Sequence, residues 1–445
     1  MASASVAAER PPSALDRALR AFADVRAGES FTALVLLVNL FLLLVGYYIL
    51  KTVREPLILA GGGAELKSYA AAGQALVLMA FIPLYSWFSS RVDREHLVLG
   101  VTLFFACNVE LFYFGARLGI PYLGVAFYIW VGIFSLATIA QFWSYANDLY
   151  SREVGQRLFP MIAVGATAGS PLGAQIAKWL FDRKVDPYDM LHLTAFILLV
   201  QLWLYWLVNR RETVAGAKSA EALGGPGGFA LVFRSRYLLL IAGLLVILNI
   251  VNTTGEYILG SAVVMQADAI AAADPAFDKK AFIGSFYGSY FFAVNVIAVL
   301  VQSFLVSRLV KRLGVWGAVL ALPLISLTAY GFLAAGAAFA AVRWAKIAEN
   351  STDYSVMNTG KQLLWLPTSR EEKYKAKQAV DTLFVRTGDL FAAGVVLLGT
   401  QFVPLSPAGF ARVNLGLVVL WLVFAWLALR QHDRLAAAAA SPGSS

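Results

Sequence analysis

The sequence of 445 residues is 59% hydrophobic and only 14% charged, and its mean hydropathy is +0.69. Soluble globular domains carry about 25% charged residues, so this composition excludes a soluble protein and indicates a multi-pass membrane protein. The net charge of +9 does not indicate a nucleic-acid partner, because the basic residues are concentrated in the connections between apolar segments.

Cysteine and histidine usage argues against a metal or redox centre. Cys107 is the only cysteine, which excludes a disulfide framework and a cysteine-based metal site. The three histidines stand at predicted helix ends without ligand-type neighbours in the sequence. We therefore predict no metal and no other cofactor. A phosphate-binding Gly-x-x-x-x-Gly-Lys-Ser/Thr loop is also missing, so nucleotide hydrolysis is not expected.

Apolar segments of about 20 residues recur from Phe31 to Leu429, and each is long enough to cross the ~30 Å hydrocarbon core of a bilayer. This pattern predicts an all-α membrane protein with twelve transmembrane helices. The predicted spans are residues 30–50, 68–88, 97–116, 121–147, 159–181, 190–208, 237–262, 282–306, 315–336, 338–363, 378–402 and 411–430.

Most of the 36 Lys and Arg residues lie before the first span or after the even-numbered spans. The positive-inside rule then places both termini in the cytoplasm, with the chain in the inner, cytoplasmic membrane of the cell. Residues 1–29 are predicted to form a cytoplasmic N-terminal tail, and residues 431–445 a disordered C-terminal tail.

The longest polar connection divides the spans six against six. Residues 209–236 contain the run Gly-Gly-Pro-Gly-Gly, which predicts a flexible cytoplasmic linker. It separates an N-terminal half, residues 30–208, from a C-terminal half, residues 237–430.

Three short similarities relate the two halves at nearly the same offset: residues 46–50 with 255–259, 90–94 with 307–312, and 150–153 with 368–371. A parallel six-plus-six repeat of this kind is the layout of the major facilitator fold. Solute sites in that layout lie between the halves, near the middle of the membrane.

Two features of the N-terminal half suggest close packing and a polar site. Gly165, Gly169 and Gly173 form consecutive Gly-x-x-x-Gly steps, which let another helix approach closely. Lys51 and Arg54 share one helical face, and a cationic face at a cavity mouth would suit phosphate or carboxylate. The alternative is that both side chains snorkel to the membrane interface. Pro56 disfavours helix at the residue before it and predicts a break there.

The seventh span carries a polar stripe in an otherwise apolar helix. Asn249, Asn252 and Glu256 fall on one face, and we predict that this face lines the solute pathway. Glu110 in the third span has no local partner. It is either a carboxylate for proton coupling or the partner of a cation on another helix.

The tenth and eleventh spans carry more charge than membrane insertion favours, since each ionised group near the bilayer centre costs about 2.5–3.5 kcal/mol. Lys346 and Asp353 share a face in the tenth span, and Glu349 lies close enough to neutralise Lys346. Lys361 has no acidic neighbour before Glu371, which makes it a better candidate for binding an anion. In the eleventh span, Arg386 and Asp389 are spaced to pair.

These residues carry a resemblance to the ATP/ADP translocase family of plastids and intracellular bacteria, which are nucleotide transporters with a major-facilitator-like fold. Family members have a Lys-Asp pair after the first span and, further on, Phe-Trp-x-x-Ala-Asn, Lys/Arg-Phe-Tyr-Pro, Asn-x-x-x-Glu, Lys-x-x-x-x-x-Pro and Lys-x-Lys-Ala-x-x-Asp elements. The similar stretches here are residues 54–65, 142–147, 157–160, 252–256, 361–367 and 375–381.

The resemblance spans residues 47–389 and implies that Arg54, Glu256 and Lys361 take part in nucleotide exchange. Three departures stand out. Arg54 replaces the family's lysine, which keeps the charge but not its geometry. An acidic residue of the fourth span is missing at residues 130–133, and the lysine that follows the seventh-span glutamate is missing at residues 258–260. These departures leave open another nucleotide or a smaller organic anion.

We therefore predict a monomeric secondary transporter, not an enzyme, that exchanges an anionic nucleotide-like metabolite across the lipid bilayer by alternating access. The candidate substrate-binding residues are Arg54, Lys51, Asn252, Glu256, Lys346 and Lys361. The candidate coupling or charge-pair residues are Glu110, Glu349, Asp353, Arg386 and Asp389. Two alternatives remain, namely a proton-coupled exporter of another small solute, and a membrane sensor or enzyme that transports nothing.

Overall fold

The computed structural model describes residues 24–26, 28–89, 91–211 and 228–440, and every regular element in these ranges is helical. The first group of helices is α2 (Ser30–Ser89), α3 (Arg94–Arg117), α4 (Leu123–Leu149), α5 (Arg152–Asp182) and α6 (Leu191–Arg211). The second group is α7 (Gly228–Arg234), α8 (Arg236–Ala273), α9 (Lys279–Val301), α10 (Ser307–Ala334), α11 (Phe339–Thr352), α12 (Asn358–Leu364), α13 (Lys377–Ala379), α14 (Val385–Leu397) and α15 (Pro407–Ala440). Five short π-helical turns join α9 to α10, join α11 to α12, and flank α13 and α14.

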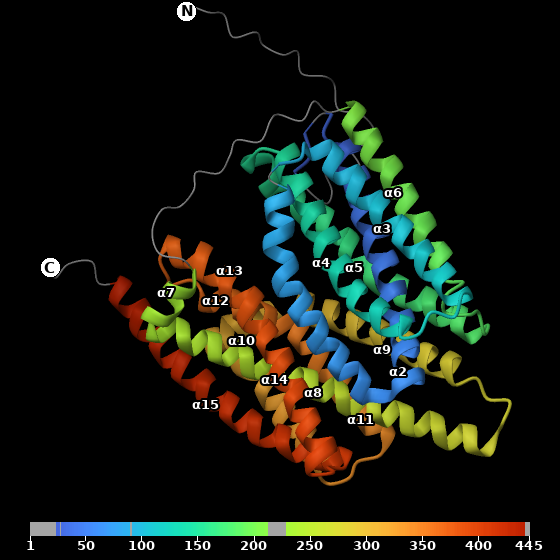
Figure 1. Cartoon of the computed structure of the whole chain (residues 1–445). Helices are drawn as coiled ribbons and strands as arrows, with labels where there is room; N and C mark the ends of the chain where they lie inside the picture. The colour runs from blue at the N-terminus through green and yellow to red at the C-terminus, as the bar shows by residue number, and fades with distance from the viewer. Residues whose placement is uncertain (1–23, 27, 90, 212–227, 441–445) are drawn as a thin grey trace, which may run out of the picture.

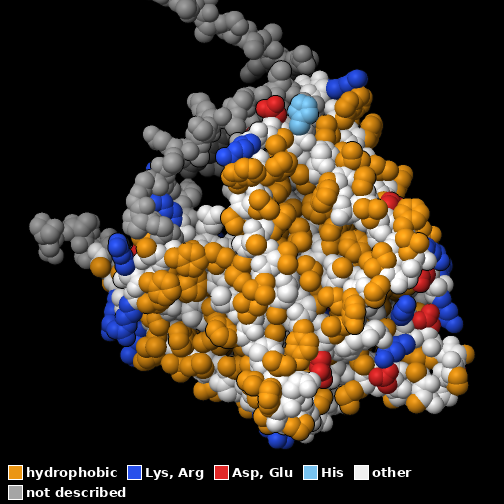
Figure 2. Space-filling view, viewed as in Figure 1, with side chains coloured by type: hydrophobic (Ala, Val, Ile, Leu, Met, Phe, Trp, Pro, Cys, Tyr) orange, Lys and Arg blue, Asp and Glu red, His pale blue; other side chains and the backbone are white. Residues whose placement is uncertain are grey.

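Eight helices within the described ranges are long and apolar enough to cross a membrane. The outer surface is correspondingly rich in hydrophobic side chains, as Figure 2 shows, and Phe104, Phe196 and Phe332 are each more than half exposed. An apolar exterior of this extent suits lipid rather than water. The prediction of an all-helical, multi-pass membrane protein is confirmed.

Two glycines interrupt long helices. Gly63 has φ 69° and ψ −172° inside α2, and Gly314 has φ 60° and ψ −151° inside α10. Only glycine adopts a positive φ at little steric cost, so each helix changes direction there. The predicted break before Pro56 was wrong, because α2 stays helical through that proline and turns at Gly63 instead. Prolines are tolerated in membrane helices, where neighbouring groups satisfy the freed carbonyls.

Figure 1 shows the helices in two groups, α2 to α6 in blue and green and α8 to α15 in yellow-green to red. The two legs of α2 lie at the border between the groups, and α2 contacts α8, α9 and α14. A second line of contact runs between α5 and α9. Side chains from both groups therefore meet along α2.

The Gly-x-x-x-Gly steps bring α5 against α2, as the sequence predicted. A Cβ atom at any of the three glycines would lie 2.4 Å from a backbone carbonyl oxygen of α2. The pairs are Gly165 with Leu37, Gly169 with Phe41, and Gly173 with Val45. Such a contact cannot be relieved by moving a side chain aside, because the atom that the added Cβ would meet belongs to the backbone of α2.

Two predicted boundaries differ from the structure. α15 continues as a helix to Ala440, beyond the predicted end of the last span, because the alanines at its end have the highest helix propensity. Part of the predicted linker is helical, since α6 extends to Arg211 and α7 begins at Gly228. The rest of that linker, residues 212–227, lies outside the described residues. So do residues 1–23 of the predicted N-terminal tail, which was expected to span residues 1–29.

We expect Gly169→Ala to destabilise the protein by roughly 1–3 kcal/mol, the usual range for overpacking a tight contact. The added methyl group would have to push α5 away from the backbone of α2. Thermal unfolding in detergent, followed by tryptophan fluorescence, measures the change. Gly416→Ala in α15 is the matched control, because a Cβ there meets nothing within 4 Å. Equal stability of the two variants would contradict the predicted contact.

Candidate functional site

A polar cavity, here called the central cavity, lies where the two groups of helices meet. It has a volume of about 200 Å³ and is lined by residues of α2, α4, α8, α9, α11 and α14 and the π-turn Asp353–Met357. Its charged lining consists of four cations and three carboxylates: Lys51, Arg54, Lys67 and Arg386, with Glu55, Glu256 and Asp389.

The cationic side of the cavity comes from α2 and is organised by Glu55. The Glu55 carboxylate is fully buried and pairs with Arg54 Nε at 3.0 Å and with Lys67 Nζ at 2.7 Å. Arg54 and Glu55 precede the break at Gly63, and Lys67 follows it. The break therefore lets the second leg of α2 return Lys67 to a carboxylate on the first leg.

Lys51 is held differently. Its ammonium group lies 4.5 Å from the centre of the Phe291 ring and 5.1 Å from that of Tyr48, and its nearest polar partner is the hydroxyl of Tyr354 at 3.4 Å. Among the described residues, no carboxylate lies within ion-pair distance of Lys51. Cation–π contacts partly compensate its burial and leave its charge available to an anion. Both side chains, Lys51 buried and Arg54 partly buried, line the cavity, which argues against the alternative of snorkelling to the interface.

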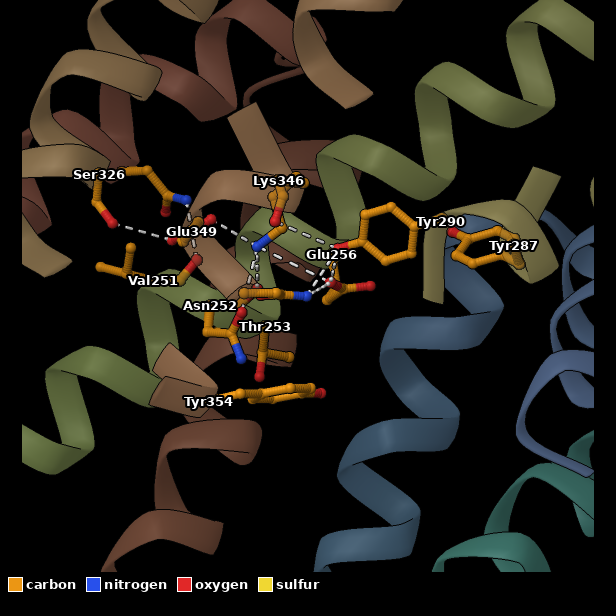
Figure 3. Close-up of polar contacts among 12 residues, drawn as sticks. Val251, Asn252, Thr253, Glu256, Tyr287, Tyr290, Ser326, Lys346, Glu349 and Tyr354 are labelled. Atoms are coloured by element: carbon orange, nitrogen blue, oxygen red, sulfur yellow. Dashed lines mark hydrogen bonds and ion pairs between the residues drawn. The ribbon is translucent and has the colours of Figure 1, made fainter. Parts of the chain in front are cut away.

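Glu256 of α8 is the carboxylate that faces both groups of helices. Asn350 donates a hydrogen bond to Glu256 Oε1 at 3.0 Å. The Tyr290 hydroxyl donates another at 3.3 Å (Figure 3). Lys67 Nζ lies 3.6 Å from Oε2, and Lys346 Nζ lies 3.9 Å from Oε1. Glu256 thus stands between a lysine of α2 and a lysine of α11.

Lys346 itself is almost fully buried behind the cavity lining. Its ammonium group pairs with Glu349 Oε2 at 2.6 Å and donates to Asn252 Oδ1 at 3.2 Å. Glu349 also accepts a hydrogen bond from Ser326 (Figure 3). It accepts another from Tyr330. The geometry favours mutual neutralisation of the pair, which the sequence allowed as an alternative to substrate binding by Lys346.

The α14 side of the cavity carries the predicted pair. Arg386 Nη1 lies 3.4 Å from Asp389 Oδ2, as the three-residue spacing predicted. Asp389 Oδ1 accepts hydrogen bonds from Asn249 at 2.8 Å and Thr253 at 2.9 Å. Of the predicted stripe on the seventh span, Asn252 and Glu256 line the central cavity, and Asn249 ties α8 to α14.

Lys361 lies in a second polar cavity of about 320 Å³, which shares Asn252 with the central one. Its ammonium group pairs with Asp353 Oδ1 at 3.0 Å, so the expectation that it has no acidic neighbour was wrong. The π-turn Asp353–Met357 begins at the first of these residues and changes the angle between the two side chains around the helix axis. The spacing of a regular α-helix therefore does not predict their contact. Lys377, paired with Asp381 at 2.9 Å, lines the same cavity.

Glu110 lies apart from both cavities. Its carboxylate is 3.0 Å from His192 Nδ1 of α6, and both side chains are partly exposed. The structure thus gives Glu110 a partner on another helix, a histidine that is a cation only when protonated.

No family model matches the sequence. Among curated proteins, ADP,ATP carrier protein 1 of Chlamydia muridarum is 22% identical over 465 residues, covering 85% of this chain and 84% of the carrier. ADP,ATP carrier protein 2 of Chlamydia trachomatis is 24% identical over 432 residues, covering 77% of each chain. ADP,ATP carrier protein 1 of Chlamydia pneumoniae is 22% identical, and the match covers 68% of this chain but 65% of that carrier.

This chain is a divergent relative of these carriers. The resemblance inferred from the sequence is thereby confirmed.

Solved structures of transporters share the fold. The POT family transporter PepTSo is 12% identical with a TM-score of 0.66, covering 91% of this chain and 98% of that one. The nucleoside transporter NupG is 11% identical with a TM-score of 0.61, covering 90% and 98%. A bacterial homologue of the iron transporter ferroportin is 16% identical with a TM-score of 0.64, covering 89% and 98%. At these identities the likeness concerns the fold alone.

Sequence reasoning missed several cavity residues. Lys67 was assigned to the connection between the first two spans, but it is buried in the second leg of α2. Glu55 was noted only as a neighbour of Arg54. Gln74 reaches the cavity through space left by Gly132, where a Cβ would lie 2.0 Å from the Gln74 amide nitrogen. The one available signal was the Gly-Gly-Gly run at residues 61–63 between Glu55 and Lys67.

Lys346→Met should destabilise the protein by about 3–5 kcal/mol, because removing one partner of a buried ion pair leaves the other charge uncompensated. The double variant Lys346→Met with Glu349→Gln should recover part of that loss. Denaturant unfolding in detergent measures both variants. If Lys346→Met kept full stability and lost only solute binding, Lys346 would instead belong to the substrate site.

Proposed function

We propose that the protein is a secondary transporter that exchanges an anionic, nucleotide-like metabolite by alternating access. The halves would be residues 30–208 and 237–430, each with six transmembrane helices. By the positive-inside rule, both termini would face the cytoplasm from the inner membrane. The central cavity is assembled within one chain, which supports a monomeric transporter.

The number of described helical legs supports twelve spans. Dividing α2 at Gly63 and the run from Lys279 to Ala334 at Gly314 turns two of the eight apolar helices into four legs. α5 and the helix from Phe339 to Leu364 supply two more. The second of these carries Lys346 and Glu349, whose mutual pairing makes its charge tolerable in a membrane.

The observation that carries the functional proposal is the charge distribution around the central cavity. α2 contributes three cations and one carboxylate to its lining, whereas α8 and α14 contribute one cation and two carboxylates. An anionic solute would therefore bind on the α2 side, where Arg54 offers a planar donor group and Lys51 an ammonium group without a carboxylate partner among the described residues. The printed names of the bacterial relatives, ADP,ATP carrier protein, support a nucleotide.

Aromatic rings in the same cavity suit a nucleobase. Tyr128 lies against the Arg54 guanidinium, 4.4 Å from ring centre to the guanidinium carbon, and Tyr354 lies beside Lys51. Flat faces of this kind stack on bases regardless of their identity. The second cavity would give the solute a further cationic binding site on its path, formed by Lys361 and Lys377.

The proton-coupled alternative has less support from the geometry. Glu110, one of its two candidate carboxylates, lies away from both cavities, and Glu256, the other, has cations on two sides.

In proteoliposomes loaded with unlabelled ADP, the purified protein should take up radiolabelled ATP, and Arg54→Gln should raise the apparent KM by at least about tenfold. A tenfold rise in KM corresponds to a loss of roughly 1.4 kcal/mol of binding free energy, which is modest for a contact between charged groups. Arg412→Gln, at an exposed position of α15, is the matched control and should leave KM unchanged.

Absence of exchange with any nucleotide, for protein that elutes as one folded species, would contradict the proposal for nucleotides. The same vesicles would then be tested with smaller organic anions. An unchanged KM for Arg54→Gln would exclude Arg54 from the substrate site.

A further inference from the structure

Among the residues that the structure describes, a single ion pair joins the polar surfaces of the two groups of helices across the central cavity. Lys67 belongs to α2 and Glu256 to α8, and their charged atoms lie 3.6 Å apart. Lys67 is also 3.5 Å from the Tyr287 hydroxyl of α9, so its ammonium group is held by residues from both groups. Neither the resemblance nor the relatives' names assign Lys67 a role.

Each partner of this pair has a second, closer attachment on its own side. Lys67 lies 2.7 Å from Glu55, which is shorter than its distance to Glu256. Glu256 keeps Asn350 and lies 3.9 Å from Lys346. Breaking the contact between Lys67 and Glu256 would therefore leave neither charge without a partner. A contact of this kind can be exchanged at low free-energy cost, unlike one whose loss strands a buried charge.

The cavity offers a competitor a place beside this pair. Lys51 and Lys67 both line it from α2, and Lys51 has no carboxylate partner among the residues described. An anionic group bound between the two lysines would attract Lys67 and repel Glu256. Glu256 would then move toward Lys346, and the electrostatic link between α2 and α8 would be lost.

The contact between α5 and α9 forms a second junction between the groups. The two helices approach closely because Gly284 and Gly288 face Phe181 and Lys178, and a Cβ at Gly288 would lie 2.7 Å from Lys178 Cβ. Ser285 donates a hydrogen bond to Asp182 at 2.5 Å. None of these residues lines the central cavity, so a bound anion would act on this junction through a link such as Lys67–Glu256.

We propose that the Lys67–Glu256 ion pair is a substrate-sensitive lock, in which a phosphate-like anion bound at Lys51 and Lys67 displaces Glu256 toward Lys346 and so releases the two halves. This proposal rests on the proposed function and adds a reason for strict exchange. The empty transporter is held by the ion pair, and only the anion-loaded transporter reorients. Lys67 acts here as a coupling residue in addition to any contact with the solute.

The test measures conformation directly and does not require the transported solute to be known. Spin labels are placed at Arg183→Cys and Lys280→Cys, at exposed positions beside the α5–α9 junction, in a Cys107→Ser background. Pulsed electron paramagnetic resonance then gives the distribution of distances between the labels, without ligand and with ATP or inorganic pyrophosphate as the probe. The background protein without ligand should show one dominant short distance.

In this background, Lys67→Gln should give a population with a longer distance between the two labels without any ligand. Glu256→Gln, which removes the other charge of the pair, should give the same longer distance. Lys67→Arg retains the charge and should restore the short distance. Lys311→Gln, at an exposed site remote from the cavity, is the matched control. Unchanged distances in both neutral variants, with normal thermal stability, would overturn the lock.

A transport measurement separates the lock from the proposed function. Vesicles containing labelled ADP should release it only when external nucleotide is present, and Lys67→Gln should raise release without external nucleotide by about tenfold or more, equivalent to roughly 1.4 kcal/mol. If no nucleotide is transported but the label distances respond to Lys67→Gln, the nucleotide assignment fails and the lock stands. If exchange is normal and equally strict in Lys67→Gln, the lock fails and the transporter assignment stands.

Discussion

The buried carboxylate of Glu55 is the group on which the rest of the central cavity depends. It pairs with Arg54 and with Lys67, and it lies closer to Lys67 than Glu256 does. Each ionised group near a bilayer centre costs about 2.5–3.5 kcal/mol on insertion scales, so an arrangement that neutralises them is needed before any solute binds. The positive φ of Gly63 makes this possible, because it folds the second leg of α2 back toward the first.

A division of charge between the two groups of helices follows from this arrangement. α2 presents an excess of cations, and α8 and α14 present an excess of carboxylates, with Glu256 at the boundary. Under the proposed function, an anion would bind on the α2 side, and the carboxylates of α8 and α14 would respond to it from the other side. The buried pair of Lys346 and Glu349 is a support behind that boundary, since it gives Glu256 an alternative cation without lining the cavity itself.

Predictions from sequence succeeded where partners are separated by one helical turn. Arg386 with Asp389, and Lys346 with Glu349, pair as their spacing indicates. Predictions failed where the backbone leaves the regular α-helix. Lys67 reaches Glu55 only because of the turn at Gly63, and Lys361 reaches Asp353 only across a π-turn. Neither irregularity has a reliable local pattern, so helical periodicity could not place these pairs.

The sequence by itself determined that the protein is a multi-pass helical membrane protein, that polar residues gather on the segments that form α8 and α11, and that it is similar to ADP,ATP carriers. Segment length, hydropathy and short motifs are local properties that can be read without a fold. Only the tertiary structure decided which cations face the cavity and which are neutralised. Lys51 has aromatic neighbours from α9, Lys67 has carboxylates from two helices, and Lys346 is enclosed behind the lining. Those differences arise from which helices meet, because the burial and the counterion of a charge are set by residues distant in the sequence.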